Sequence, residues 1–195
     1  ELARLNYFGR VNYAFRDRYL VEFVWRYDGS QIFDPDYRWG FFPGVSAGWV
    51  ITEESFMSNV SWVSRLKLRG SYGTLGNDRI DPYQYLAAFE FGGNYIFNEN
   101  TDTKSLRPSS VANQGVSWEV ARNTNIGIEG TLFNGKVNFE FDVFRNLRTD
   151  ILYPANASVP LTAGFEPPDQ NIGEVENKGF DMSVGYTGTI SQDAS

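Results

Sequence analysis

The chain alternates apolar and polar residues with a period of two along several segments. In "YLVEFVWRYDGS" (19–30), one side of the pattern holds Tyr19, Val21, Phe23, Trp25 and Tyr27, and the other holds Leu20, Glu22, Val24, Arg26 and Asp28. Such alternation is typical of an antiparallel strand with one apolar and one polar face. The apolar face must be covered, either by a second protein layer or by lipid.

Six other segments show the same alternation. They are "RLNYFGRVNYAF" (4–15), "WGFFPGVSAGWVI" (39–51), "RLKLRGSYGT" (65–74), "TNIGIEGTL" (124–132), "KVNFEFDVFR" (136–145) and "GFDMSVGYTG" (179–188). Together with the first segment they predict an all-β protein, built as an antiparallel up-and-down meander of about seven strands.

Each predicted strand has an apolar row on one side and a charged row on the other. The apolar row includes Val21, Phe23, Trp25, Leu66, Leu68, Phe139, Phe141 and Val184. The charged row includes Arg10, Glu22, Arg26, Lys67, Arg69, Glu129, Glu140, Asp142 and Asp181. A membrane β-barrel would turn the apolar row to lipid and the charged row to a water-filled lumen. A β-sandwich would bury the apolar row between two sheets and expose the charged row to solvent.

The connections between the predicted strands differ in length at the two ends of the meander. Short joints are expected at "RDR" (16–18) and at "NG" (134–135), the latter a two-residue hairpin signal. Residues 53–64 are expected to hold one helical turn capped by Thr52. Longer loops are expected at 28–38, 76–117 and 149–175. Long loops at one end and short turns at the other are typical of outer-membrane barrels.

Two features favour a barrel over the alternative, a soluble β-sandwich that binds carbohydrate through its aromatic residues. Aromatic residues lie near both ends of the apolar rows, among them Trp25, Trp39, Tyr19 and Trp49. This spacing matches the aromatic girdles where a barrel crosses the two membrane interfaces. In addition, no Lys or Arg lies at the centre of an apolar row, where it would cost roughly 2–4 kcal/mol against lipid.

Composition argues against several function classes. The 195 residues carry a formal net charge of −7, and without basic clusters we expect no nucleic-acid partner. The chain has no Cys and no His, which removes thiolate nucleophiles, the usual general base and the commonest zinc ligand. We therefore expect no enzyme, cofactor or metal site, and we interpret Glu140 and Asp142 as part of a solvated wall.

Several motifs in series resemble the barrel of the SusC/RagA family of TonB-dependent outer-membrane transporters. They are "NYAFRDRYL", "RYDGS", "RWGFFPGVSAGWVITEESFM", "LKLRGSYGTLGND", "WEVARNTNIGIEG" and "NIGEVENKGFDMSVGY", in the order and approximate spacing of that family. The resemblance covers nearly the whole chain except the long loops. It implies part of a large plugged barrel of about 22 strands in the outer membrane of a Gram-negative bacterium.

The resemblance also implies an activity and partners. Such a transporter imports oligosaccharides or peptides too large for passive porins, draws energy from the TonB complex, and pairs with a SusD-like surface lipoprotein. Residues 1–195 show no signal peptide, TonB box, plug domain or C-terminal closing strand. We therefore expect a fragment of the barrel domain that contacts outer-membrane lipid and a glycan or peptide substrate. TonB would be reached through N-terminal parts that this chain lacks.

Aromatic residues in the longest predicted loop are candidates for binding. Tyr83, Tyr85 and Tyr95 lie among Asn and Gly residues, and their rings could stack on a sugar or contact the lipoprotein lid. The alternative is that these rings pack the loop on itself, because a large loop needs its own core.

Overall fold

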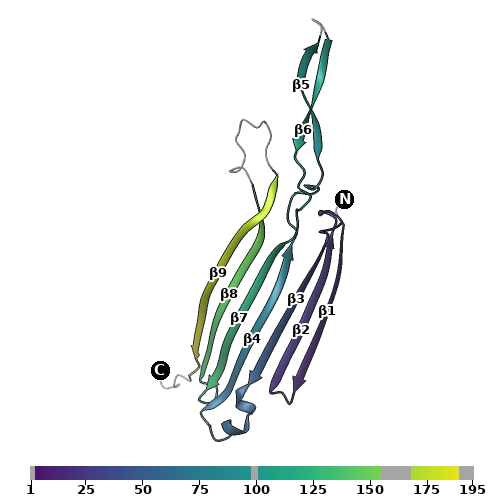
Figure 1. The fold of residues 1–195 in the computed structure, drawn as a ribbon. Helices are drawn as coiled ribbons and strands as arrows, with labels where there is room; N and C mark the ends of the chain where they lie inside the picture. Colours follow the sequence, from purple (N-terminus) through teal and green to yellow (C-terminus); the bar gives the residue numbers. More distant parts are fainter. Residues whose placement is uncertain (1–2, 98–100, 155–167, 189–195) are drawn as a thin grey trace, which may run out of the picture.

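A computed structural model describes residues 3–97, 101–154 and 168–188, which form a curved single layer of strands (Figure 1). The strands are β1 (Arg4–Phe15), β2 (Tyr19–Ser30), β3 (Trp39–Val50), β4 (Val63–Asn77), β5 (Ala88–Phe97), β6 (Thr101–Ser110), β7 (Glu119–Leu132), β8 (Val137–Pro154) and β9 (Asp169–Tyr186). Seven of them form an antiparallel sheet in the order β1-β2-β3-β4-β7-β8-β9, and β5 and β6 form a separate two-stranded sheet. The predicted seven-stranded meander is confirmed.

The strand registers separate the two predicted rows onto opposite faces, because directly paired residues point to the same side of a sheet. One line of pairs runs across six strands through Tyr19, Trp49, Leu68, Ile128, Phe141 and Met182. The neighbouring line on the other side runs through Gly48, Arg69, Gly127, Asp142 and Asp181. We call the first side the apolar face and the second the charged face.

No second protein layer covers the apolar face in the part of the chain that the structure describes. Phe180, Met182 and Val184 are 69%, 70% and 62% exposed, and Phe23 is 42% exposed. A β-sandwich would bury these side chains between facing sheets. The soluble β-sandwich alternative is therefore wrong.

One end of the sheet is closed by short connections, as expected, but the connection at "NG" has four residues, 133–136, where the sequence predicted a two-residue hairpin. Arg16 and Asp17 adopt left-handed φ values of 53° and 52°, and Asn134 and Gly135 adopt 56° and 88°, as tight hairpin turns require. The third connection holds two 3₁₀ helices, η1 (Ile51–Glu53) and η2 (Ser55–Met57). No helix among the described residues is long and apolar enough to cross a membrane.

The prediction that Thr52 caps a helical turn is wrong. Val50 is the N-cap residue of η1, and its side chain makes no capping hydrogen bond. The hydroxyl of Thr52 instead accepts a hydrogen bond from the backbone N–H of Leu66 at 3.4 Å. Thr52 therefore ties the connection to the first residues of β4.

The opposite end carries the longer connections, but two of them differ from the prediction. The segment 76–117 contains the β5–β6 hairpin, which projects beyond the main sheet (Figure 1). The predicted loop 149–175 is too long, because β8 continues to Pro154 and β9 begins at Asp169. A register shift between Arg148 and Ile151, with Asp150 at φ 59°, breaks the alternation there while the strands continue.

Candidate functional site

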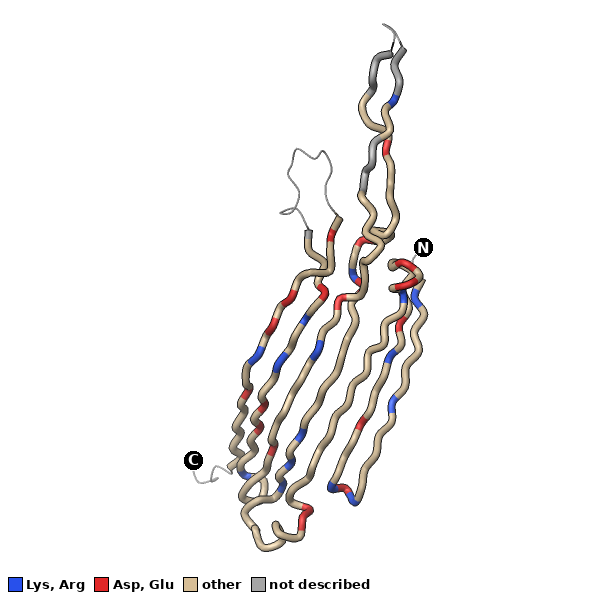
Figure 2. Tube along the Cα trace, viewed as in Figure 1, with Lys and Arg blue, Asp and Glu red and all other residues tan. Residues whose placement is uncertain are grey.

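The charged face brings together residues from strands far apart in the sequence. All nine residues of the predicted charged row lie on it, and the eight residues of the predicted apolar row lie on the opposite face. Acidic and basic residues are spread along the strands of the main sheet (Figure 2). The alternation thus predicted which residues share a face, and the assignment of the faces to lumen and lipid stays a prediction.

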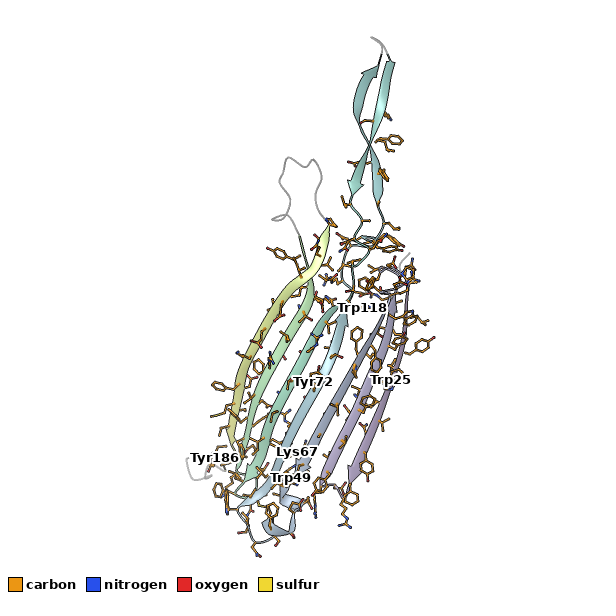
Figure 3. All side chains as sticks on the ribbon, viewed as in Figure 1. Trp25, Trp49, Lys67, Tyr72, Trp118 and Tyr186 are labelled. Carbon is orange, nitrogen blue, oxygen red and sulfur yellow. The ribbon has the colours of Figure 1, made fainter. Side chains whose placement is uncertain are left out.

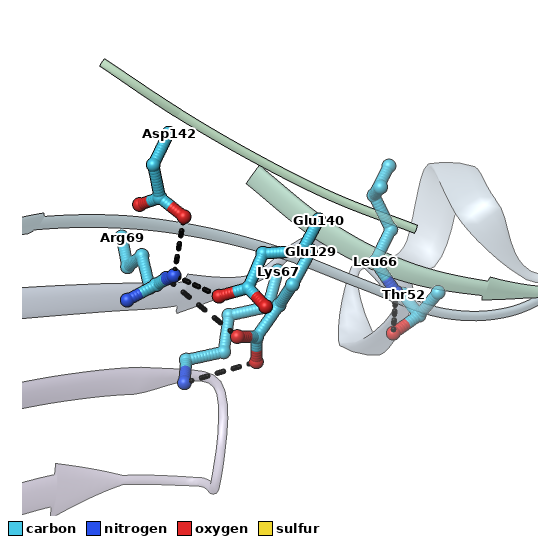
Figure 4. A network of polar contacts seen from close by, with 7 residues as sticks. All are labelled: Thr52, Leu66, Lys67, Arg69, Glu129, Glu140 and Asp142. Atoms are coloured by element: carbon cyan, nitrogen blue, oxygen red, sulfur yellow. Dashed lines mark hydrogen bonds and ion pairs between the residues drawn. The ribbon is translucent and has the colours of Figure 1, made fainter. Parts of the chain in front are cut away.

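A network of ion pairs centred on Arg69 crosses three strands of the charged face (Figure 4). The Arg69 guanidinium donates to Asp142 Oδ2 at 2.7 Å and also pairs with Glu140. Its Nε lies 3.6 Å from Glu129 Oε2, and Lys67 Nζ lies 3.3 Å from Glu129 Oε1. The network fixes β4, β7 and β8 relative to one another and holds two cations against three carboxylates.

Gly127 makes the space that this network needs. A Cβ at position 127 would lie 2.2 Å from Asp142 Oδ1 and 3.2 Å from Arg69 Nε. Asp142 is only 7% exposed, and its Oδ1 has no hydrogen-bond partner among the described residues. The Asp142 carboxylate therefore lies over Gly127 of β7 and pairs with Arg69.

Two further ion pairs lie on β1 and β2 of the charged face. Arg10 lies 3.6 Å from Glu22, and Arg26 lies 3.1 Å from Asp28. A concavity of about 550 Å³ is lined by residues that include Glu22, Lys67, Arg69, Ser71 and Asn125. Among the described residues, no group of three or more Asp or Glu side chains is arranged to hold a metal ion.

A small hydrophobic core anchors the loop between β2 and β3, and sequence analysis missed it. Phe33 and Val116 are fully buried. The Trp118 ring packs against Phe33 at 5.2 Å and against Phe42 at 5.4 Å between centroids, at the end of the sheet opposite the short turns (Figure 3). Two adjacent apolar residues, Ile32 and Phe33, inside an otherwise polar loop were the available signal.

Of the three tyrosines predicted to contact a ligand or lid, the structure describes the side chains of Tyr83 and Tyr85. Tyr83 accepts a hydrogen bond from Gln31 Nε2 at 3.0 Å, and its ring lies 6.3 Å from that of Tyr85. The side chain of Tyr95 lies outside the part of the chain that the structure describes. Contact of these residues with a ligand or a lid stays a prediction.

Glu54 gathers three side chains at the short-turn end. The Tyr19 hydroxyl and the Trp49 indole N–H donate to its Oε1 at 2.6 Å and 3.1 Å, and Arg18 Nη1 lies 2.9 Å from Oε2. The hydrogen bond from Tyr19 is the main cause that lowers the pKa of the Glu54 carboxyl below its ordinary value. Partial burial acts in the opposite direction, and Trp49 and Arg18 lower the pKa further.

Comparison with known proteins assigns the family. Residues 3–194 match the family model described as "TonB dependent receptor-like, beta-barrel". The chain belongs to this family. Its members are outer-membrane proteins of Gram-negative bacteria, so the predicted fold class, family and localisation are confirmed.

Relatives of this β-barrel receptor segment match along nearly all of its length. It is 38% identical over 184 residues to TonB-dependent receptor P26 of Formosa agariphila. This match covers 93% of this chain and 18% of P26. It is 34% identical to TonB-dependent receptor SusC of Bacteroides thetaiotaomicron, over 97% of this chain and 19% of SusC. The chain spans about a fifth of the length of these curated relatives.

A solved structure shows the same arrangement of strands. A chain of the RagAB peptide importer in the "open-open" state superposes with a TM-score of 0.84 and 30% identity. The match covers 98% of this chain and 20% of that chain. The seven-stranded layer is thus similar to a sector of the RagAB barrel.

Proposed function

We propose that the chain forms part of the wall of a TonB-dependent importer, with its apolar face toward lipid and its charged face toward the lumen. The observation that carries this proposal is the single-layered sheet, whose apolar face is exposed while its charged face is cross-linked by ion pairs. Lipid would cover the apolar residues at no desolvation cost, and a wet lumen would solvate the charges. The end with the longer connections then faces the outside of the cell.

The whole protein would import oligosaccharides or other large nutrients, including peptides, without catalysing a reaction. Support comes from the similarity to SusC and to the RagAB peptide importer. A plug domain, a TonB box and the C-terminal barrel strands would belong to parts of the protein outside residues 1–195. A SusD-like lipoprotein would cover the barrel, and the TonB complex would act on the N-terminal parts.

Within this proposal the described residues neither contact the TonB complex nor react with the nutrient. Their part is mechanical: the Arg69 network holds the register of β4, β7 and β8 while ligand and plug move past the wall. The anchored β2–β3 loop and the β5–β6 hairpin would form the outer rim at which ligand and lipoprotein arrive.

Uptake by cells that carry the complete gene tests this proposal. We expect labelled oligosaccharides or peptides to enter cells with the intact gene, and entry to stop when the gene is deleted or when TonB is inactivated. Oligosaccharides and peptides are offered separately, so the experiment also identifies the nutrient class. Uptake that continues without TonB would contradict the proposal.

A further inference from the structure

Charged residues on the apolar face are confined to one side of the sheet. In the described parts of β1 to β4, every residue on this face is uncharged. In β7, β8 and β9, by contrast, it carries Glu174 and Glu176 as well as three basic residues, Arg122, Arg145 and Lys178, which we call the basic row. Figure 2 shows basic segments at a similar height on these three strands. A face directed toward lipid needs a reason to hold cations at this place.

The depth of the basic row corresponds to the outer boundary of the hydrocarbon layer. Arg145 is the ninth residue counted from Val137 at the short-turn end of β8, and Lys178 is the ninth counted from Tyr186 in β9. Arg122 is the eleventh residue counted from Leu132 in β7. A barrel strand crosses the hydrocarbon in about 9–11 residues. The corresponding ninth position of β2 is Tyr27, whose ring stacks on Trp39 at 4.8 Å between centroids. Aromatic rings thus mark this level on one side of the sheet, and cations mark it on the other.

Two cations of the basic row, Arg145 and Lys178, share a single carboxylate, that of Glu176. Arg145 and Lys178 are directly paired across β8 and β9, an arrangement of like charges that destabilises a sheet. Glu176 lies between them, 2.6 Å from Arg145 and 3.4 Å from Lys178. One carboxylate is therefore shared by two cations, whose side chains remain 60% and 73% exposed.

The third member of the basic row has a neutral partner. Arg122 donates to the Thr149 hydroxyl at 2.7 Å, and that hydroxyl in turn donates to Asp150. Glu176 is level with Arg122, because Leu147 of β8 pairs with both, whereas Glu174 and Asp150 lie farther toward the longer connections. From the short-turn end outward, the face is therefore first apolar, then carries Arg145 and Lys178, and farther out carries Arg122 together with the acidic residues.

We propose that the basic row binds the phosphate groups of the phosphorylated glycolipid that forms the outer leaflet of the Gram-negative outer membrane. This inference rests on the proposed function, because it requires the apolar face to meet lipid. Phosphates of such a lipid lie directly above the acyl chains, at the level of the row. Arg and Lys bind phosphate through charge-assisted hydrogen bonds, and each basic residue near an anionic membrane surface adds to the attraction.

The test uses the full-length receptor, purified and placed in vesicles with either the phosphorylated glycolipid or its dephosphorylated form. We expect the phosphorylated form to raise the thermal midpoint and the dephosphorylated form to have little effect. The double variant R145Q/K178Q should lose roughly fivefold in glycolipid affinity for each charge removed. The control R10Q/R148Q removes two charges from the opposite face of the sheet and should bind as the unaltered receptor does.

Three further arms keep the inference falsifiable. The charge-conserving variant R145K/K178R should retain binding, which separates loss of charge from loss of folding. E176Q removes the competing carboxylate and should tighten glycolipid binding. Inorganic phosphate alone should give no comparable rise in thermal midpoint. Equal binding by R145Q/K178Q and the control, weaker binding by E176Q, or an equal effect of free phosphate would overturn the inference. Normal nutrient uptake with any of these results would leave the proposed function standing.

Discussion

Gly127 leaves room on the charged face for side chains from two neighbouring strands. A Cβ at this position would lie 2.2 Å from Asp142 Oδ1, so Gly127→Ala must displace a buried carboxylate that Arg69 neutralises. We expect the free energy of unfolding of the whole barrel to fall by about 1–3 kcal/mol, measured by urea unfolding in detergent. Gly185→Ala is the matched control, because a Cβ there meets no atom within 4 Å. Equal effects of the two changes would contradict the packing role of Gly127.

Glu54 makes the stability of the short-turn end depend on pH. Its pKa is lowered in the folded state, so its contribution is full above the unfolded-state pKa of about 4.3. That contribution is lost as the pH falls through the lower folded-state pKa. We expect Glu54→Gln to lower the thermal midpoint at pH 7, and the difference from the unaltered protein to disappear in acid. Glu53→Gln, a change at the exposed neighbouring carboxylate, should show no such pH-dependent difference.

Between β2 and β3, one buried ring fixes a whole connection. Phe33 is fully buried against Trp118, and truncating a buried Phe costs about 3–5 kcal/mol. We expect Phe33→Ala to release residues 31–38, so that a protease cleaves there much faster while the barrel stays folded. Tyr37→Ala in the same loop is the control, because Tyr37 is 47% exposed. Equal cleavage of both variants would show that the loop is not anchored by Phe33.

Period-two alternation predicted all seven strands of the main sheet, because each has one apolar and one polar face. The alternation failed to predict the strands in two places, at the register shift of β8 and β9 and in the β5–β6 hairpin. The loop predicted at 149–175 begins at the register shift, although β8 continues to Pro154 and β9 begins at Asp169. The β5–β6 hairpin was missed even though Phe89 and Phe91 alternate in β5, because the segment around Thr101–Ser110 is mostly polar.

The charged face could be predicted from the sequence only as a list of residues. Its ion pairs join residues such as Arg69 and Asp142, 73 positions apart, and such pairs depend on the register of β4, β7 and β8 together. A shift of one residue in any strand would move its charges to the other face. The sequence pattern determines which face a side chain occupies, and the combined registers determine which partner it meets.

The whole sheet has two open edges and an uncovered apolar face. Among the described residues β1 pairs only with β2, and β9 pairs only with β8. Unpaired edge groups attract other strands in water and are strongly unfavourable in lipid. We therefore expect the isolated 195-residue chain to aggregate in buffer without detergent, as measured by light scattering, whereas the full-length receptor refolds in detergent to a monodisperse barrel. A compact, soluble monomer of the isolated chain would contradict the assignment of the apolar face to lipid, because its exposed Phe, Met and Val side chains would then have found cover within the chain itself.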